Sequence, residues 1–320
     1  MLHLRIVAPA EIARSAVELL RQSPSVCNVV HLAGVATEPE GDLILADVAR
    51  EDASVVLEDL KALDIEHHGA IAVHEIDVQI SKRAELAVKH ARGAPSDAVV
   101  WEEVQSRTSE ATELSASFLV FMVVATLIAG VGIYLDSSIL IVGAMVVGPE
   151  FGPLAGFCVA AVSRRPDVAL RSFRALAVGF PVGIGVALLT FIVFRETGIT
   201  SAQFSEADHE LGVIIASPDF FAFFVAACAG VAGVLSLSTA KSGALIGVLI
   251  SVTTIPAAAN IGLSAAYADW ESFRGSVLQL LINFASILLF GTLALAIQRG
   301  FYDRRRARHR RETPATRKRR

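Results

Sequence analysis

A glutamate lies between two Gly-Pro pairs inside a long apolar stretch. The segment 137–163 is apolar enough for a bilayer, but its centre reads Gly148, Pro149, Glu150, Phe151, Gly152 and Pro153. Each proline removes a backbone donor and crowds the preceding turn, so this centre predicts a broken helix. A carboxylate in hydrocarbon is costly and usually faces a protein interior or a water-filled cavity. We expect Glu150 to bind a proton, a cation or an amine; the alternative is a structural role, accepting amide donors freed by the break.

A second apolar segment, 242–267, carries hydroxyl and amide side chains around one proline, Pro256. A break there would free backbone groups that need partners in protein, water or substrate. The helix after the first break would point amide donors and its positive end toward the same level of the membrane. For the hydroxyls, the alternative is a bond back to their own helix. We therefore predict one substrate or ion site made of Gly148, Pro149, Glu150, Gly152, Pro153, Ser251, Thr253, Thr254, Pro256 and Asn260.

The composition predicts a polytopic α-helical membrane protein. The chain has 320 residues, of which 53% are hydrophobic, and its mean hydropathy is +0.57. Charge is segregated, because residues 1–115 hold twenty Asp and Glu against ten Lys and Arg, whereas the following 180 residues contain long uncharged runs. We predict six spans in a transmembrane domain, 116–298, at 116–135, 138–163, 172–194, 218–238, 242–267 and 277–298.

The charges between the spans predict the orientation of the chain. Basic residues gather in the connection 163–174 and after Arg299, whereas the opposite connections are mainly acidic. This asymmetry predicts a multi-pass protein of the inner (cytoplasmic) membrane with both termini in the cytoplasm, and the start of the sequence shows no signal-peptide pattern. Spans one to three and four to six would then have inverted topology. Paired interrupted helices in the two halves of an inverted 3+3 repeat indicate a transporter site.

The amino-terminal residues predict a small α+β domain, 1–80. Apolar residues alternate in strands and recur at helical spacing in helices, in the order β-α-β-β-α-β, over 2–8, 11–22, 25–33, 43–49, 51–63 and 70–78. This is the order of a ferredoxin-like βαββαβ domain, which we expect to regulate or to form a homo-oligomer. A linker and stalk helix, 81–115, would lead to the first span.

Histidine and cysteine residues do not form a recognised metal motif. Six of the eight histidines fall in the first 90 residues, which would suit a metal or ligand sensor. No pair has a recognised metal spacing, so ordinary surface histidines are favoured. The cysteines, at positions 27, 158 and 228, are too far apart in sequence to suggest a disulfide framework or a zinc site. We predict no metal and no cofactor.

The carboxyl-terminal segment, 299–320, is a basic cytosolic tail with eleven Lys and Arg. A basic cluster beside a span attracts anionic lipid and helps to fix orientation. We expect a disordered tail that contacts lipid, in preference to a nucleic-acid partner. Docking on the acidic amino-terminal domain is the other alternative.

The segment around the first break resembles a known family. Ser137-Ser138-Ile139-Leu140-Ile141-Val142-Gly143-Ala144-Met145-Val146-Val147-Gly148-Pro149, followed by Gly152-Pro153, is similar to the signature of the DUF389 family of hydrophobic membrane proteins. The resemblance covers about residues 98–265 and implies a polytopic membrane protein whose biochemical role is unassigned. The chain departs from that pattern at Glu150, where an apolar residue is expected, and at Pro256, where a double proline is common.

Two functions fit these observations. The first is a secondary transporter or channel for a small solute or ion, with its site at the midplane between the broken helices. The alternative is a non-transporting membrane receptor or scaffold whose cytosolic domain senses a small ligand. The spans show no Ser/His or paired-Asp arrangement and no zinc motif, so we predict that the protein is not an enzyme.

Overall fold

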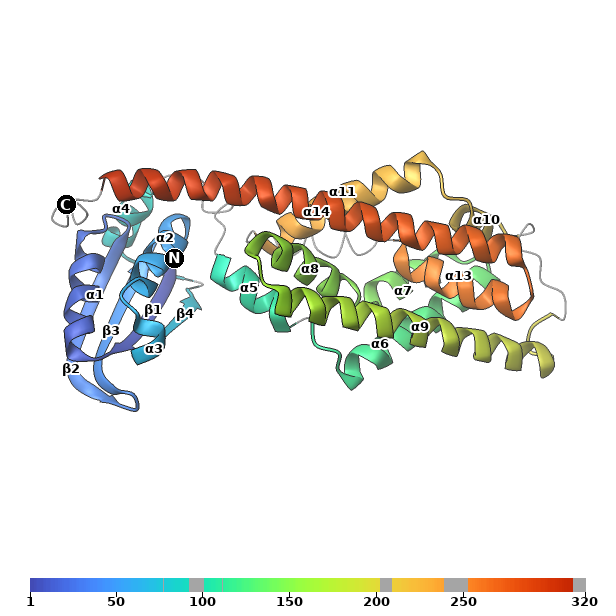
Figure 1. Ribbon diagram of the computed structural model, residues 1–320, viewed down its shortest axis with the longest axis horizontal. Coiled ribbons are helices and arrows are strands. Elements are labelled where there is room, and N and C mark those ends of the chain that lie inside the picture. The colour runs from blue at the N-terminus through green and yellow to red at the C-terminus, as the bar shows by residue number, and fades with distance from the viewer. Residues whose placement is uncertain (77, 92–100, 111, 202–208, 239–252, 313–320) are drawn as a thin grey trace. The chain divides into compact units, whose positions relative to one another are not determined.

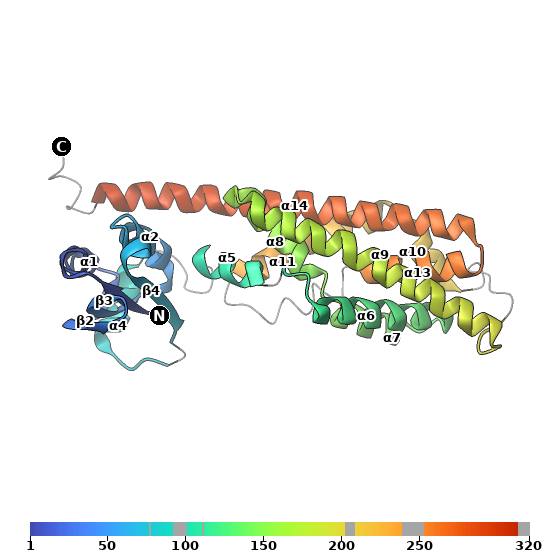
Figure 2. The ribbon, with the colours of Figure 1, turned by 60° about the horizontal axis from the view of Figure 1, so that its bottom comes forward.

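A computed structural model describes residues 1–76, 78–91, 101–110, 112–201, 209–238 and 253–312 (Figures 1 and 2). The chain forms two compact units. We call the first the sheet unit; it is built mainly on Met1–Glu103 and also takes residues from Gly300 onward. The second, the helical unit, holds Val104–Leu237 and 253–299. Each unit is described by itself below.

The sheet unit contains a four-stranded antiparallel sheet in the order β2-β3-β1-β4. Its strands are β1 (Leu2–Ala8), β2 (Val26–Thr37), β3 (Glu40–Val48) and β4 (Ala70–Glu75). Alternate residues of β1 are fully buried, as a half-buried strand requires. They pack with residues of α1 (Ala10–Gln22) and α2 (Arg50–Lys61) in one apolar core, and the short helix α3 (Ile65–His68) adds Ile65.

The predicted β-α-β-β-α-β order of elements is present, with α3 as an addition between α2 and β4. The strand β2 continues four residues beyond its predicted end, and β4 ends three residues before its predicted end. The predicted stalk region contains α4 (Lys82–His90) and α5 (Trp101–Glu110). Residues 92–100 of this region lie outside the described residues.

The carboxylate of Asp42 fixes the irregular part of the β2–β3 hairpin. Asp42 accepts hydrogen bonds from the backbone N–H of Gly34 at 2.9 Å and from the ring of His31 at 2.7 Å. Gly34 has φ +66°, a conformation in which a residue with a side chain is strained. The pKa of Asp42 lies below its ordinary value of 3.8, chiefly because of the Gly34 amide and secondly because of the His31 hydrogen bond.

Asp42→Asn is expected to lower the thermal stability of the sheet unit at neutral pH. A carboxyl whose pKa is depressed by folding contributes stability above its ordinary value of 3.8 and loses it as the pH falls below that value. The difference in Tm between the variant and the wild type should therefore shrink in acid. Circular dichroism melts of the full chain across pH would measure it, with Glu38→Gln in the same hairpin as the control. A difference that stays constant below that pH would contradict this assignment.

The helical unit contains helices that are long and apolar enough to cross a membrane. They are α6 (Ala116–Tyr134), α9 (Pro166–Glu196), α11 (Phe220–Ser238) and α14 (Trp270–Glu312). The pair α7 (Ser138–Val147) and α8 (Phe151–Ser163) passes the same test together, with a bend of 50° between them. The unit also contains the shorter α10 (Glu210–Ala216) and α13 (Thr254–Ala266). Helices α6 and α7 lie side by side (Figures 1 and 2).

The described residues thus give four spans, or five if the bent pair counts as one, where six were predicted. The difference lies in the segment 242–267, whose first part is outside the described residues and whose described helix, α13, is only 13 residues long. The prediction of a disordered tail from residue 299 onward is wrong for its first part, because α14 continues as a helix to Glu312. Arginine favours helices, and Pro314 is the first proline after the span.

Glycine contacts bring α6, α9 and α13 close together. A Cβ at Gly130 of α6 would overlap the Phe191 ring of α9, and one at Gly262 of α13 would lie 2.9 Å from the Ile184 carbonyl oxygen of α9. Small residues allow helix backbones to approach in this way. Gly130 and Gly262 thus allow α13 to pack against α9 and α6. Twelve of the 13 residues of α13 are buried.

Candidate functional site

The helix break lies where the two prolines predict it. Helix α7 ends at Val147, and Gly148, with φ −61° and ψ 130°, leaves the helical conformation. Helix α8 begins at Phe151, so Pro153 stands in its first turn, where the missing N–H would have no helical partner. The break and the start of α8 therefore follow directly from the Gly-Pro pairs.

The side chain of Glu150 is enclosed in protein at this break. Only 1% of the residue is exposed, and its Oε1 accepts a 2.9 Å hydrogen bond from the Thr254 hydroxyl. Its Oε2 lies against the α-carbon of Gly148 and has no hydrogen-bond partner among the described residues. The side chain makes no capping hydrogen bond to α8, so the alternative in which it serves the helix start gains no support.

Helix α13 begins at Thr254, whose hydroxyl bonds Glu150. Pro256 falls in the first turn of α13, a position that a proline tolerates, as Pro153 does in α8. The part of the segment 242–267 before Thr253 lies outside the described residues, so the break at Pro256 stays a prediction. Asn260, about one turn further along α13, donates to the Ser276 hydroxyl at 2.9 Å. Its Oδ1 is buried and has no partner among the described residues.

A second group of polar side chains comes from one face of α14. Asn283 donates to the Thr253 hydroxyl at 2.9 Å, and Gln279 donates to the Asn283 side-chain oxygen at 3.2 Å. Gln279 and Asn283 are 3% and 1% exposed, and the Gln279 Oε1 has no partner in the described part of the chain. We call Glu150, Thr253, Thr254, Gln279 and Asn283 the polar cluster.

Two residues of the polar cluster, Thr253 and Gln279, border a cavity of about 530 Å³ in the helical unit. Ser217 and Asp219 add polar groups to its wall, and the rest is apolar side chains of α10 and α11. This volume lies within the range of small-molecule sites, which are mostly apolar with a few placed polar groups. The cavity therefore gives the polar cluster a space in which a small solute can be held.

The structure brings together part of the predicted site. Glu150 and Thr254 are in contact, Thr253 lies next in the chain, and Gly148 and Pro149 form the break beside them. Asn260 bonds to Ser276 and takes no part in the contact with Glu150. Gly152 and Pro153 belong to the first turn of α8, and Ser251 lies outside the described residues.

The sequence reasoning missed Gln279 of the polar cluster and Ser276, the partner of Asn260. In the sequence, Asn283 is a weak site candidate for which an interhelical hydrogen bond is favoured, and it donates such a bond to Thr253. The spacing of 276, 279 and 283 puts all three side chains on one helix face. A search for polar residues at that spacing within the last span would have found them.

Four histidines of the sheet unit, His3, His31, His67 and His68, lie beside carboxylates. His3 and Asp47 are 2.7 Å apart, and Asp47 also accepts hydrogen bonds from Asn28 and Gln79. Within the described residues, no group of three or more His, Cys, Asp or Glu side chains is arranged to hold a metal ion. The described histidines therefore give no candidate metal site.

Comparisons with known proteins agree with the resemblance drawn from the sequence. The chain is 26% identical over 212 residues to an uncharacterized protein, MJ0678, of Methanocaldococcus jannaschii. The match covers 62% of this chain and 61% of that relative's length. No solved structure matches the chain. The family model described as "Domain of unknown function (DUF389)" matches residues 145–289, which contain the helix break and all five residues of the polar cluster, and the predicted resemblance to that family is confirmed there.

Proposed function

We propose that the helical unit is a secondary transporter or channel for a small solute or ion. The observation that carries the proposal is the state of Glu150, a carboxyl buried in an apolar unit with one hydroxyl donor and one oxygen that has no partner among the described residues. Its position at a helix break supports a solute site. The cavity bordered by two other members of the polar cluster, Thr253 and Gln279, gives further support. No catalytic role is proposed for any residue.

The chemistry of the site favours a proton or a cation as the species that binds there. Burying an ionised carboxylate costs a large free energy unless a counter-charge or hydrogen bonds replace its water. Thr254 supplies one hydrogen bond to Oε1. A proton, a monovalent cation or an amine at Oε2 would supply the rest. The amide and hydroxyl oxygens of Gln279, Asn283 and Thr253 are suitable ligands along a path from the cavity.

Glu150→Gln is expected to reduce flux through the helical unit to the level of protein-free liposomes. The amide has nearly the same shape but cannot bind a proton or pair with a cation. Flux of H⁺, Na⁺, K⁺ and methylammonium into proteoliposomes, measured separately, would test it. If the wild-type protein carries none of these four above the protein-free level, the proposal in this form is wrong.

A matched pair of threonine variants distinguishes loss of the contact with Glu150 from a general effect of removing a buried hydroxyl. Thr254→Val removes the hydroxyl that bonds Glu150, and Thr126→Val removes a fully buried hydroxyl that bonds the Met122 carbonyl of its own helix. Flux should fall in the first variant and persist in the second. Equal flux in the two variants would count against a role for the Thr254–Glu150 contact.

We also propose the finer arrangement that the sequence predicts. The antiparallel order β2-β3-β1-β4 supports a ferredoxin-like fold for the sheet unit. The basic connection 163–174 and the basic residues of α14 support cytoplasmic termini, a cytoplasmic (inner) membrane and contact with anionic lipid. Six spans in an inverted 3+3 repeat and a homo-oligomer complete the proposal, and scanning cysteine accessibility in sealed vesicles would test the topology.

The second candidate function is a receptor or scaffold that does not transport. It is favoured by a pocket in the sheet unit, which is separate from the polar cluster. Ligand binding by the sheet unit together with no ion flux would select this function.

A further inference from the structure

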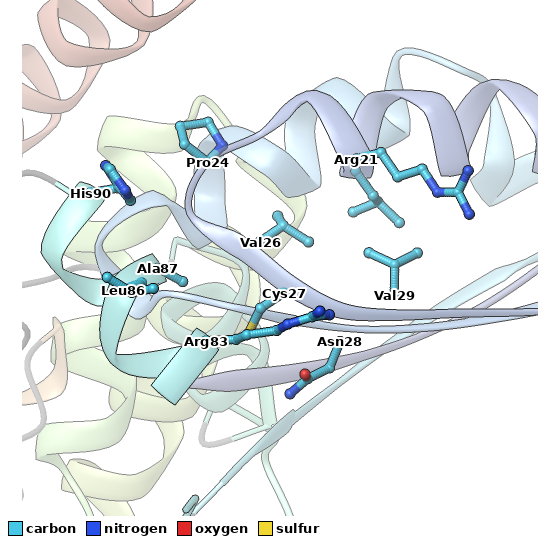
Figure 3. A pocket seen from close by; sticks show the side chains of 11 residues that line it. Arg21, Pro24, Val26, Cys27, Asn28, Val29, Arg83, Leu86, Ala87 and His90 are labelled. Carbon is cyan, nitrogen blue, oxygen red and sulfur yellow. The ribbon is translucent and has the colours of Figure 1, made fainter. Parts of the chain in front are cut away.

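The sheet unit has a pocket of about 450 Å³ at its edge strand β2. The pocket lies between the C-terminal end of α1, the start of β2 and helix α4 (Figure 3). It is lined by Leu20, Arg21, Pro24, Val26, Cys27, Asn28, Val29, Arg83, Leu86, Ala87 and His90. The lining contains no Asp or Glu among the described residues.

The polar side chains of this pocket are mainly cationic. Figure 3 shows the Arg83 side chain reaching from α4 toward Cys27 and Asn28, while Arg21 comes from α1. Neither arginine forms an ion pair with a described residue. Asp47 of β3 pairs with Cys27 across the sheet, but its carboxylate already accepts hydrogen bonds from His3, Asn28 and Gln79. The two guanidinium groups thus remain available to an anion.

Side-chain packing and one hydrogen bond hold the wall of the pocket in place. Cys27, 9% exposed, packs against Ala84 and Ala87 of α4 and so fixes that helix on β2. Asn28 has φ +53°, and its side chain is held in place by its 2.8 Å hydrogen bond to Asp47. Leucine and valine side chains cover the remaining wall. This arrangement gives an apolar surface beside a basic edge.

We propose that this pocket binds a small organic anion. A carboxylate or phosphate-monoester head group accepts hydrogen bonds from Arg83 and Arg21, because the planar guanidinium matches the geometry of both oxyanions. A branched apolar body packs on Leu20, Val26 and Leu86. The volume is within the range of small-ligand sites. This inference concerns the sheet unit and does not rest on transport by the helical unit.

Titration calorimetry with the full chain in detergent micelles tests the proposal. The probes are isocaproate, isopentyl phosphate and inorganic phosphate, with isocaproamide as the neutral counterpart. We expect one or both organic anions to bind, and isocaproamide not to. Comparison of the two organic anions assigns the head group, and binding of inorganic phosphate alone would overturn the need for an apolar body. Failure of all probes, or equal binding of isocaproamide, would overturn the proposal.

Variants of α4 assign the binding to this pocket. Arg83→Ala should weaken affinity about tenfold or more, the loss of a charge-assisted hydrogen bond, and Arg83→Lys should retain part of it. Lys82→Ala, the neighbouring exposed residue that does not line the pocket, should bind as the wild type does. Equal affinities for Arg83→Ala and Lys82→Ala would show that the anion binds elsewhere.

Cys27 provides a readout inside the pocket. Burial raises the pKa of its thiol above the ordinary value, with Asp47 adding to the effect, so alkylation should be slow at neutral pH and faster in mild alkali. In a chain with Cys158→Ala and Cys228→Ala, the bound anion should slow alkylation of Cys27 at a fixed alkaline pH. An unchanged rate at saturating anion would contradict occupancy of this pocket.

Discussion

Gly275→Ala is expected to destabilise the helical unit by about 3 kcal/mol, at the upper end of the cost of overpacking. Gly275 lies in the first turns of α14, where an added Cβ would overlap the backbone carbonyl of Ala216 at the end of α10. Backbone atoms cannot move aside by changing a rotamer. The two helices must therefore separate, and the contact that sets the start of α14 would be lost.

Gly300→Ala is the matched control for this variant. Gly300 belongs to the same helix, α14, in the part that is counted with the sheet unit, and a Cβ there would meet no atom of the described residues within 4 Å. Replacing a helical glycine by alanine then adds only helix propensity, about 0.5–1 kcal/mol in favour of folding. Thermal unfolding in micelles should therefore move in opposite directions for the two variants. A Gly275→Ala protein as stable as the wild type would show that α10 and α14 are not packed this closely.

Gly148→Ala is expected to abolish most of the flux while changing stability much less. An added Cβ would overlap Oε2 of Glu150 and would lie 2.8 Å from Cγ1 of Ile255. Since a carboxyl side chain can rotate, Glu150 would turn away from Thr254 instead of unfolding the unit. Misplacing a functional group by about 1 Å can cost on the order of 10²-fold in rate. Proteoliposome flux of the ion carried by the wild type would measure the loss.

Gly143→Ala, in the interior of α7, is the control for Gly148→Ala at the end of that helix. A Cβ at Gly143 would meet no atom of the described residues within 4 Å, so flux should remain near the wild-type level. Both variants add one methyl group, but only the one at Gly148 would meet Glu150. If both transport equally well, the position of the Glu150 carboxyl has no influence on transport.

The sequence predicts the parts of this molecule that depend on local chemistry. Alternating apolar residues predict the strands, and alternate residues of β1 are indeed buried. The Gly-Pro pairs predict the break at Gly148 and Pro149, because a proline lacks an amide hydrogen and has a fixed φ wherever it occurs. The contact between Glu150 and Thr254 joins residues 104 positions apart. Their types suggested a shared site, but only packing of α13 on its neighbours brings the two side chains together.

The predictions that failed depend on competition between effects. In the basic tail, repulsion between like charges opposes a helix. The helix propensity of arginine and the extension of an already formed helix favour one, and α14 continues to Glu312. Gln279 was overlooked because a single amide has little effect on the hydropathy of a long apolar segment.

The burial of α13 has a consequence for how the protein is made. A helix that inserts into a membrane by itself must present apolar side chains to lipid over about 20 residues. Helix α13 has 13 residues, is enclosed by α6, α7, α9 and α10, and includes Thr254, Asn260 and Ser264 among its buried residues. Lipid contact therefore contributes little to its placement. We therefore expect α13 to take its position only after the helices around it have entered the proposed bilayer, which would make the polar cluster one of the last parts of the protein to be assembled.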